Sequence, residues 1–409
     1  MKDVVLLGGV RTPVGLHGGA LRDMRAQDLA RLVLAEVIKR TGIDVNVIDE
    51  VIMGNIGQPS DAANVARVAA LMAGVPEHVP AYTVARNCAS GLQAITCAYQ
   101  AIQADDGEVF LVGGTESMSN IPYILKGARW GLKLRHSELT DALWEGLTDP
   151  IVNQIMGRTA ENVAEMYEIT RQAQDEYAIQ SHKKAFMATR QEKFKDEIVP
   201  VEIVKKIAGQ EVAREQITQD EGINPTLSMQ KAGMYPTVFK KVNGTVTPAN
   251  SCPISDGAAA LLVMTAEKAK SLGMQPMARI VAYDYAALDP AIMGLGPARA
   301  IPKLFAKMKK RGIGISFDEV DLIELNEAFA AQALGCAKEL TANGFNWDWK
   351  KVNVNGGAIA LGHPVGATGS KLTVSILNEL KRRKARYGIV TMCVGGGQGG
   401  VMLVENLAA

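Results

Sequence analysis

The chain has 409 residues, of which 47% are hydrophobic and 21% are charged, so it can bury a large core spread over two or three domains. Its 44 basic and 43 acidic residues leave a net charge of +1, which argues against nucleic acid or an anionic membrane as a partner. The five cysteines are odd in number and include no C-x-x-C pair, which argues against a disulfide framework and a structural metal site. These features predict a cytoplasmic protein.

Short apolar runs alternate with amphipathic stretches in the first third of the chain. The first apolar run, residues 4–10, is too short for a signal peptide or a membrane span and predicts a strand. The following segments predict helices at 26–41 and 62–73, and strands at 49–55, 82–87 and 108–118. This alternation of elements with buried strands indicates an α/β fold.

A cysteine lies where one of these strands gives way to a helix, in the stretch RNCASGLQAI at residues 86–95. The N-terminus of a helix carries partial positive charge and free N–H groups, which favour a thiolate. The position therefore predicts that Cys88 is a reactive cysteine with a lower pKa than Cys393, which ends a strand before glycines. Cys97 and Cys336 lie on apolar helical faces, and the pattern predicts that both belong to the core.

A region of different character follows, at residues 119–248. It contains Trp130 and Trp144, and patterns that predict helices at 160–167 and 170–193. Loop-rich insertions of this kind commonly carry ligand or partner contacts. A core strand and a helix resume at 255–273.

The order of elements then repeats. Residues 317–333 resemble 47–58, because each segment has an acidic pair, an apolar strand and an Asn at the strand end. The strand, small-residue turn and helix after residue 351 correspond to those around Cys88, and the strand at 387–397 corresponds to 108–118. The sequence thus predicts two related halves.

Three segments of the second half place chemically active side chains at strand ends or in tight turns. They are NEAFAAQ with Asn326, GGAIALGHPVGATG with His363, and MCVGGGQGG with Cys393. Such side chains converge over the carboxyl ends of parallel strands. Histidine is the usual proton carrier at neutral pH, a second cysteine can exchange a proton, and the glycine N–H groups can bind an oxyanion.

With these motifs in order, the chain resembles the thiolase family from RTPVG at 11–15 to GGGQGG at 395–400. The resemblance implies a five-layered α-β-α-β-α body built from two repeated βαβαβαββ halves. It places the N-terminal half at 1–118 plus 249–274 and the C-terminal half at 275–409. An inserted loop domain at 119–248 would serve coenzyme A (CoA) binding and oligomer contacts.

The resemblance also implies roles for the active side chains. Cys88 resembles the nucleophile that takes the acyl group as a thioester, and His363 resembles the base that activates it. Cys393 resembles the acid/base at the substrate α-carbon. Asn326 resembles the holder of a water that forms one oxyanion hole with His363, and the N–H groups of Cys88 and Gly395 would form the other. The implied reaction is thiolysis of 3-ketoacyl-CoA, including acetoacetyl-CoA, and the reverse condensation of acetyl-CoA.

Further residues match substrate positions of the family. Met156 and Met293 resemble methionines that line the acyl pocket. Cys252 stands where a serine is common near the pantetheine, and Ser251 and Ala249 belong to the same segment. CoA and acyl-CoA are the implied partners and act as substrates, so no separate cofactor is expected.

Two features bear on substrate and assembly. Ile155 stands where acetoacetyl-CoA-specific members often have His, which favours a wider range of acyl chains. Basic residues within 126–135 and 205–241 are candidates for contacts with CoA phosphates, although a solvated face explains them equally well. We expect a homodimer or a homotetramer.

Alternatives of other classes remain. A 3-ketoacyl-acyl-carrier-protein synthase-like condensing enzyme shares the fold and the nucleophile, but MCVGGG and NEAFAAQ favour a thiolase. A non-catalytic, thiolase-like lipid-binding protein would not need all four active side chains. A dinucleotide-binding protein is disfavoured because no G-x-G-x-x-G follows the first strand.

Overall fold

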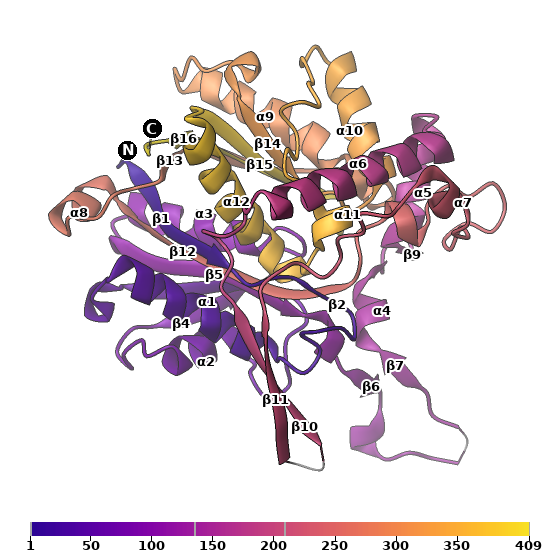
Figure 1. Cartoon of the computed structure of the whole chain (residues 1–409), viewed down its shortest axis with the longest axis horizontal. Helices are drawn as coiled ribbons and strands as arrows, with labels where there is room; N and C mark the ends of the chain where they lie inside the picture. Colours follow the sequence, from indigo (N-terminus) through magenta and orange to yellow (C-terminus); the bar gives the residue numbers. More distant parts are fainter. Residues whose placement is uncertain (1, 135, 208–209, 409) are drawn as a thin grey trace.

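The main sheet runs through the whole molecule in the order β4-β3-β5-β12-β1-β13-β16-β15-β14 (Figure 1). The computed structural model describes residues 2–134, 136–207 and 210–408, without the side chains of 205–207. Strands of the first half are β1 (Val4–Arg11), β3 (Glu50–Gly54), β4 (Ala81–Val84), β5 (Val109–Ser117) and β12 (Ser255–Thr265). Strands of the second half are β13 (Ala278–Ala287), β14 (Leu322–Leu325), β15 (Tyr387–Val394) and β16 (Gln398–Asn406).

The two halves share one strand order and one set of directions. In the first half β4, β3 and β5 are parallel, while β12 is antiparallel to β5 and β1 is antiparallel to β12. In the second half β14 and β15 are parallel, β16 is antiparallel to β15, and β13 is antiparallel to β16. A short antiparallel pairing of β1 with β13 joins the halves. The internal repeat predicted from the sequence is therefore present.

Helices cover the sheet in three layers. The hydrophobic clusters place one pair on the outer face of the first half, one pair on the outer face of the second half, and a central pair between the halves. In that order, the pairs are α1 (Ala26–Thr41) with α2 (Val65–Met72), α9 (Gly296–Lys310) with α10 (Ala330–Ala342), and α3 (Ser90–Gln103) with α12 (Thr368–Arg383). The five-layered α/β architecture expected from the resemblance is thereby confirmed.

Alternation along the strands explains why both faces of the sheet are buried. In β1, Val4 and Leu6 pack toward the central helices, whereas Val5 and Leu7 pack toward α1. Successive side chains of a strand point to opposite faces, so an unbroken apolar run can supply two cores. A strand with water on one face would have needed polar residues at every second position.

The central helices approach each other through small residues. A Cβ atom at Gly369 of α12 would lie 2.1 Å from the backbone nitrogen of Leu92 in α3. A Cβ atom at Gly91 would lie 2.7 Å from the Ser370 nitrogen, and the Ser370 hydroxyl donates to the Gly91 carbonyl at 3.0 Å. Backbone contact of this kind is open only to residues without side chains, so the glycines determine how closely α3 and α12 pack.

The segment between β5 and β12 forms hairpins and helices at the side of this body. Its helices are α4 (Ala142–Gly146), α5 (Met156–Met166), α6 (Arg171–Arg190) and α7 (Met229–Gly233), and a short helix, α11 (Ala358–Leu361), packs on α6. Its strands are β6 (Tyr123–Leu125), β7 (Leu139–Asp141), β8 (Thr148–Asp149), β9 (Gln154–Ile155), β10 (Val201–Ile207) and β11 (Gln210–Ile217). Two further short elements, β2 (Gly15–Leu16) and α8 (Ala266–Ser271), flank β12.

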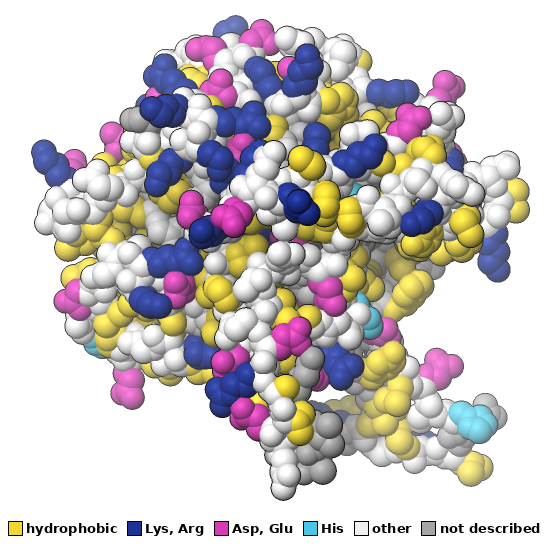
Figure 2. All heavy atoms as spheres, viewed as in Figure 1, with side chains coloured by type: hydrophobic (Ala, Val, Ile, Leu, Met, Phe, Trp, Pro, Cys, Tyr) yellow, Lys and Arg dark blue, Asp and Glu magenta, His cyan; other side chains and the backbone are white. Residues whose placement is uncertain are grey.

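The inserted segment is anchored to the body by buried charges and projects from it at its hairpins. Arg11 at the end of β1 donates to Glu197 at 2.6 Å and to Asp220 at 2.7 Å. The β6–β7 hairpin extends from the body at the lower right and carries hydrophobic side chains on its surface (Figures 1 and 2). Across the described residues, no helix is both long and apolar enough to span a bilayer.

The α3–α12 contact predicts a specific stability loss. Gly369→Ala should lower the free energy of unfolding by about 1–3 kcal/mol, because the added methyl group overlaps the Leu92 backbone. Gly314→Ala is the matched control, since a Cβ atom there meets nothing within 4 Å. Urea denaturation of both variants measures the difference; equal midpoints would show that the helices can separate without loss.

Candidate active site

The turn between β4 and α3 presents Cys88 just before the helix. The Ser90 hydroxyl accepts the Arg86 N–H at 2.8 Å and donates to the Asn87 carbonyl at 2.8 Å. Asn87 has a φ of 42°, in the left-handed region that Asn tolerates better than most residues. These features close a tight turn, so Cys88 lies at the N-terminal end of α3 as predicted.

Burial dominates the electrostatic environment of Cys88. Burial raises the pKa of its thiol to about 11, although the backbone N–H groups of Gly395 and of Cys88 itself act on the sulfur and lower the pKa. Desolvation of a thiolate therefore outweighs the stabilisation that the turn supplies. The helix start alone therefore does not make Cys88 a thiolate, and Cys88 needs a base to become nucleophilic.

His363 can supply that base. Burial, with a contribution from the charge of Lys371, lowers the pKa of His363 to about 3, so the ring is neutral. The Thr368 hydroxyl donates to the Pro364 carbonyl at 3.0 Å and lies 2.6 Å from Nδ1 of His363. Because that hydroxyl proton is engaged, Nδ1 carries the ring proton and donates it to Thr368. Nε2 is left unprotonated, with a lone pair that can accept a proton.

Asn326 lies beside this unprotonated nitrogen. Its Nδ2 is 3.4 Å from Nε2 of His363, and its backbone N–H donates to the Thr391 carbonyl of the neighbouring strand β15 at 2.9 Å. The Oδ1 atom is buried and has no hydrogen-bond partner among the described residues. Two polar groups thus converge in a buried setting, which is the arrangement needed to bind a polarised oxygen or the water beside it.

Cys393 is the next-to-last residue of β15. Burial raises the pKa of its thiol well above the usual value, and the neighbouring Cys88 raises it further. The two thiols are therefore close enough for a charge on one to affect the other. A thiol that stays protonated at neutral pH is suited to give a proton to a carbanion, or to take one after deprotonation, rather than to attack as a free thiolate.

Apolar side chains surround these groups. Met293, Phe329 and Cys393 are buried in one hydrophobic cluster, against which Met156 and Cys252 pack. A Cβ atom on Gly395 would lie 3.5 Å from the sulfur of Met156. The methionines expected to line the acyl pocket thus lie beside the glycine turn and Cys393.

The other two residues expected near the pantetheine behave differently. The Ser251 hydroxyl donates to the Thr247 carbonyl at 2.8 Å, so it is engaged within its own loop. Ala249 packs in a separate cluster with Ile179, Leu227 and Ala232. The structure does not bring Ala249 into the cluster that contains Cys393.

Comparisons with known proteins agree with this geometry. A model of the thiolase N-terminal domain matches residues 4–267, and a model of the thiolase C-terminal domain matches residues 274–406. The chain belongs to the thiolase family. An acetyl-CoA acetyltransferase from Syntrophomonas wolfei is 43% identical over 99% of this chain and 100% of its own length.

Solved structures are similar to this thiolase over their full length. The crystal structure of the Bacillus anthracis acetyl-CoA acetyltransferase has a TM-score of 0.94 and 46% identity, and the match covers 100% of this chain and 99% of that one. The human mitochondrial 3-ketoacyl-CoA thiolase in complex with CoA has a TM-score of 0.91 and 38% identity, with 99% of this chain and 98% of that chain covered. The thiolase prediction is confirmed, and neither alternative gains support.

Sequence reasoning missed a buried carboxylate next to the site. Glu116 at the end of β5 accepts the N–H groups of Ile56, Gly57 and Gly366 at 3.1, 2.8 and 2.7 Å. Burial nevertheless raises its pKa to about 7. Gly366 belongs to the loop that carries His363, so Glu116 ties this loop to the first half of the thiolase. The motif GGTESM contains the residue, but its role depends on loops far apart in the sequence.

The basic residues considered for CoA phosphates are partly neutralised. Lys126 forms an ion pair with Glu145, and Lys240 forms one with Glu165. Arg135 and the side chains of Lys205 and Lys206 lie outside what the structure describes. A contact between the basic residues of 126–135 or 205–241 and the CoA nucleotide stays a prediction. Within the described ranges, no group of three His, Cys, Asp or Glu residues is arranged to hold a metal ion.

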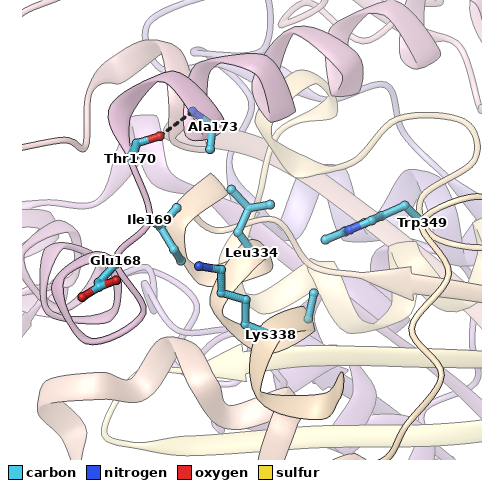
Figure 3. Close-up of a pocket in the computed structure, with 8 residues that line it drawn as sticks. Glu168, Ile169, Thr170, Ala173, Leu334, Lys338 and Trp349 are labelled. Atoms are coloured by element: carbon cyan, nitrogen blue, oxygen red, sulfur yellow. Dashed lines mark hydrogen bonds between the residues drawn. The ribbon is translucent and has the colours of Figure 1, made fainter. Parts of the chain in front are cut away.

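A separate surface pocket of about 270 Å³ lies between the α5–α6 connection, α10 and Trp349 (Figure 3). Ile169 and Leu334 contribute apolar walls, while Glu168 and Lys338 bring charges to it (Figure 3). None of the residues that line it is a predicted catalytic or substrate residue. The pocket is therefore distinct from the thiolase active site.

Proposed function

We propose that this thiolase cleaves 3-ketoacyl-CoA with CoA and runs the reverse condensation of acetyl-CoA, through an acyl thioester on Cys88. CoA is a substrate in this scheme, and the inserted region at 119–248 contributes to its binding. The observation that carries the proposal is two pairs of groups: a neutral His363 whose Nε2 lies 3.4 Å from the Asn326 amide, and the thiols of Cys88 and Cys393, of which the first raises the pKa of the second.

In the first half-reaction His363 takes the proton of Cys88 through Nε2. The thiolate attacks C3 of the 3-ketoacyl-CoA, and the C2–C3 bond then breaks to leave an acyl group on sulfur. The oxygen on C3 becomes negative at the tetrahedral stage. The N–H groups of Cys88 and Gly395, which already act on the sulfur, stabilise that charge.

The electron pair of the broken bond passes to C2 as an enolate of acetyl-CoA. Cys393 donates a proton to C2, while Asn326 with its water and protonated His363 stabilise the enolate oxygen. The proton on His363 then passes to the Cys393 thiolate, so both groups are neutral again. In the second half-reaction the thiol of CoA attacks the thioester and gives its proton to His363, from which the departing Cys88 sulfur takes it. Release of the acyl-CoA product restores the Cys88 thiol and completes the cycle.

A labelling experiment separates these roles. Incubation with acetyl-CoA should place an acetyl group on the Cys88 peptide, as measured by peptide mass analysis. Cys393→Ala should still be acetylated, because its thiol acts only at the α-carbon, yet should fail to condense a second acetyl-CoA and to exchange α-protons with deuterated water.

Cys97→Ala is the control, because Cys97 is outside the proposed site; this variant should match the wild type in both reactions. Acetylation of Cys252 or Cys393 in place of Cys88 would refute the assignment. A folded Cys393→Ala protein that cannot be acetylated would show that Cys393 also serves the acyl-transfer step.

We further propose that the acyl pocket accepts chains longer than acetoacetyl. Ile155 directly precedes Met156 at the start of α5, so an apolar side chain stands at the pocket wall. Each added methylene contributes up to about 0.8 kcal/mol in an apolar pocket, so kcat/KM for 3-ketohexanoyl-CoA should stay within about a hundredfold of that for acetoacetyl-CoA. Ile155→His should reduce this ratio, whereas Ile151→His, at a side chain that is 82% exposed, should not. A wild-type kcat/KM for 3-ketohexanoyl-CoA more than about a hundredfold below that for acetoacetyl-CoA would contradict the proposal.

We also propose that the β6–β7 region contacts further copies of the chain. Trp130, Leu139 and Trp144 are 87%, 67% and 60% exposed, and large apolar side chains gather on this projecting hairpin (Figure 2). Light scattering of the wild type should give the mass of a dimer or tetramer. Leu139→Lys combined with Trp144→Gln should lower that mass or weaken the assembly; a monomeric wild type would exclude the proposal.

A further inference from the structure

Asn87 connects the nucleophile turn with the glycine turn of the second half. Its Nδ2 donates to the Gly395 carbonyl at 2.8 Å. A Cβ atom on Gly395 would lie 3.4 Å from the same Nδ2, so the amide lies directly against this glycine. The contact joins residues that are 308 positions apart in the chain.

The preceding residue makes a parallel connection. The guanidinium of Arg86 donates to Gln93 of α3 at 2.7 Å and to Gln398 of β16 at 2.9 Å, and it lies 4.2 Å from the centre of the Tyr285 ring. Arg86 therefore fixes the far end of the glycine turn, at Gln398. Asn87 holds the near end, at Gly395.

The glycine turn needs such anchors. Residues 395–397 are three consecutive glycines, and Gly396 and Gly397 have φ values of 84° and 77°. Glycine permits these conformations but has no side chain to hold one of them. The peptide N–H of Gly395 acts on the Cys88 sulfur, so its direction matters for the chemistry. The amide of Asn87 is the side-chain contact that restrains this glycine from the nucleophile side.

We propose that Asn87 is a positioning residue for acyl transfer: its amide holds Gly395 so that the Gly395 N–H stays directed at the sulfur of Cys88 and at the oxygen of the bound acyl group. This inference rests on the proposed role of Cys88 as the acylated nucleophile. Asn87 itself touches no reacting atom. It acts through the position of Gly395, since the carbonyl that it binds and the N–H that meets the sulfur belong to the two peptide units on either side of this residue.

Two variants separate the amide from the backbone conformation. Asn87→Gly keeps a residue that adopts φ of 42° without strain and removes only the hydrogen bond to Gly395. Asn87→Asp tolerates the same conformation, but its carboxylate cannot donate to the Gly395 carbonyl and repels it. Asn87→Ala adds strain to the loss of the amide and serves as the comparison.

Three measurements read out positioning. Single-turnover acetylation of Cys88 by acetyl-CoA in Asn87→Gly should be slower by about tenfold, and in Asn87→Asp by more, because one oxyanion donor is no longer aligned. KM for acetyl-CoA should stay within about twofold of the wild-type value, since the side chain does not bind substrate. Alkylation of Cys88 by iodoacetamide, followed from pH 7 to 10, should rise with pH in the wild type and be shifted to higher pH in both variants. This shift follows because loss of the Gly395 donor raises the pKa of the thiol.

The outcomes decide between a positioning and a merely structural role. Asn87→Gly with wild-type acetylation and alkylation would overturn the proposal, and so would a defect confined to Asn87→Ala, which would assign the effect to backbone strain. A variant that has a lower melting temperature and a lower activity, but an unshifted alkylation profile, would also overturn it. Wild-type protein that is not acetylated on Cys88 at all would instead refute the proposed function, which keeps the two failures distinct.

Discussion

The backbone contact between α3 and α12 is the constraint on which the active site depends. Gly91 and Gly369 bring the two central helices to a distance that side chains would forbid. Because Cys88 precedes one helix and His363 precedes the other, the contact brings together the two segments that carry the proposed nucleophile and the proposed base. A wider helix spacing would preserve the layers of the fold and still separate the reacting groups.

Burial then determines the protonation states. Desolvation keeps His363 neutral and holds the Cys88 and Cys393 thiols in their protonated forms. None of the three groups carries a charge until substrate arrives and a proton moves between them. A site of this kind avoids the cost of a permanently buried thiolate, and it makes each charged state transient and dependent on the N–H groups and Asn326 around it.

Glu116 shows that the same burial has a thermodynamic consequence. Its carboxylate accepts three backbone N–H groups from loops of both halves, and still its pKa is raised from 4.5 to about 7. A folded-state pKa above the unfolded value means that the native state binds the proton more tightly. The contribution of Glu116 to stability is therefore largest below pH 4.5 and is lost as the pH rises through 7. At neutral pH the ionised carboxylate therefore adds less to stability than the protonated group does at low pH. It nevertheless joins the His363 loop to the segment that follows β3.

The fold and the candidate catalytic groups can be predicted from the sequence, whereas the environment of those groups cannot. Periodicity predicted α1 at 26–41 with the bounds observed, and the motifs brought Cys88, Asn326, His363 and Cys393 to notice because each follows a strand or opens a helix. The β10–β11 hairpin went unpredicted, since five of the eight residues of β11 are polar and neither strand keeps the alternation that marks a half-buried strand.

The protonation state of Cys88 lies beyond the sequence for a different reason. Local sequence reports the helix start that stabilises a thiolate, whereas burial of the thiol and the nearby charge of Glu116, which both raise its pKa, come from segments far apart in the chain. The same limit applies to Asn87 and to Thr368, whose partners become visible only when distant turns meet. Local pattern can thus name the groups that react, while the long-range contacts that tune them belong to the packed structure.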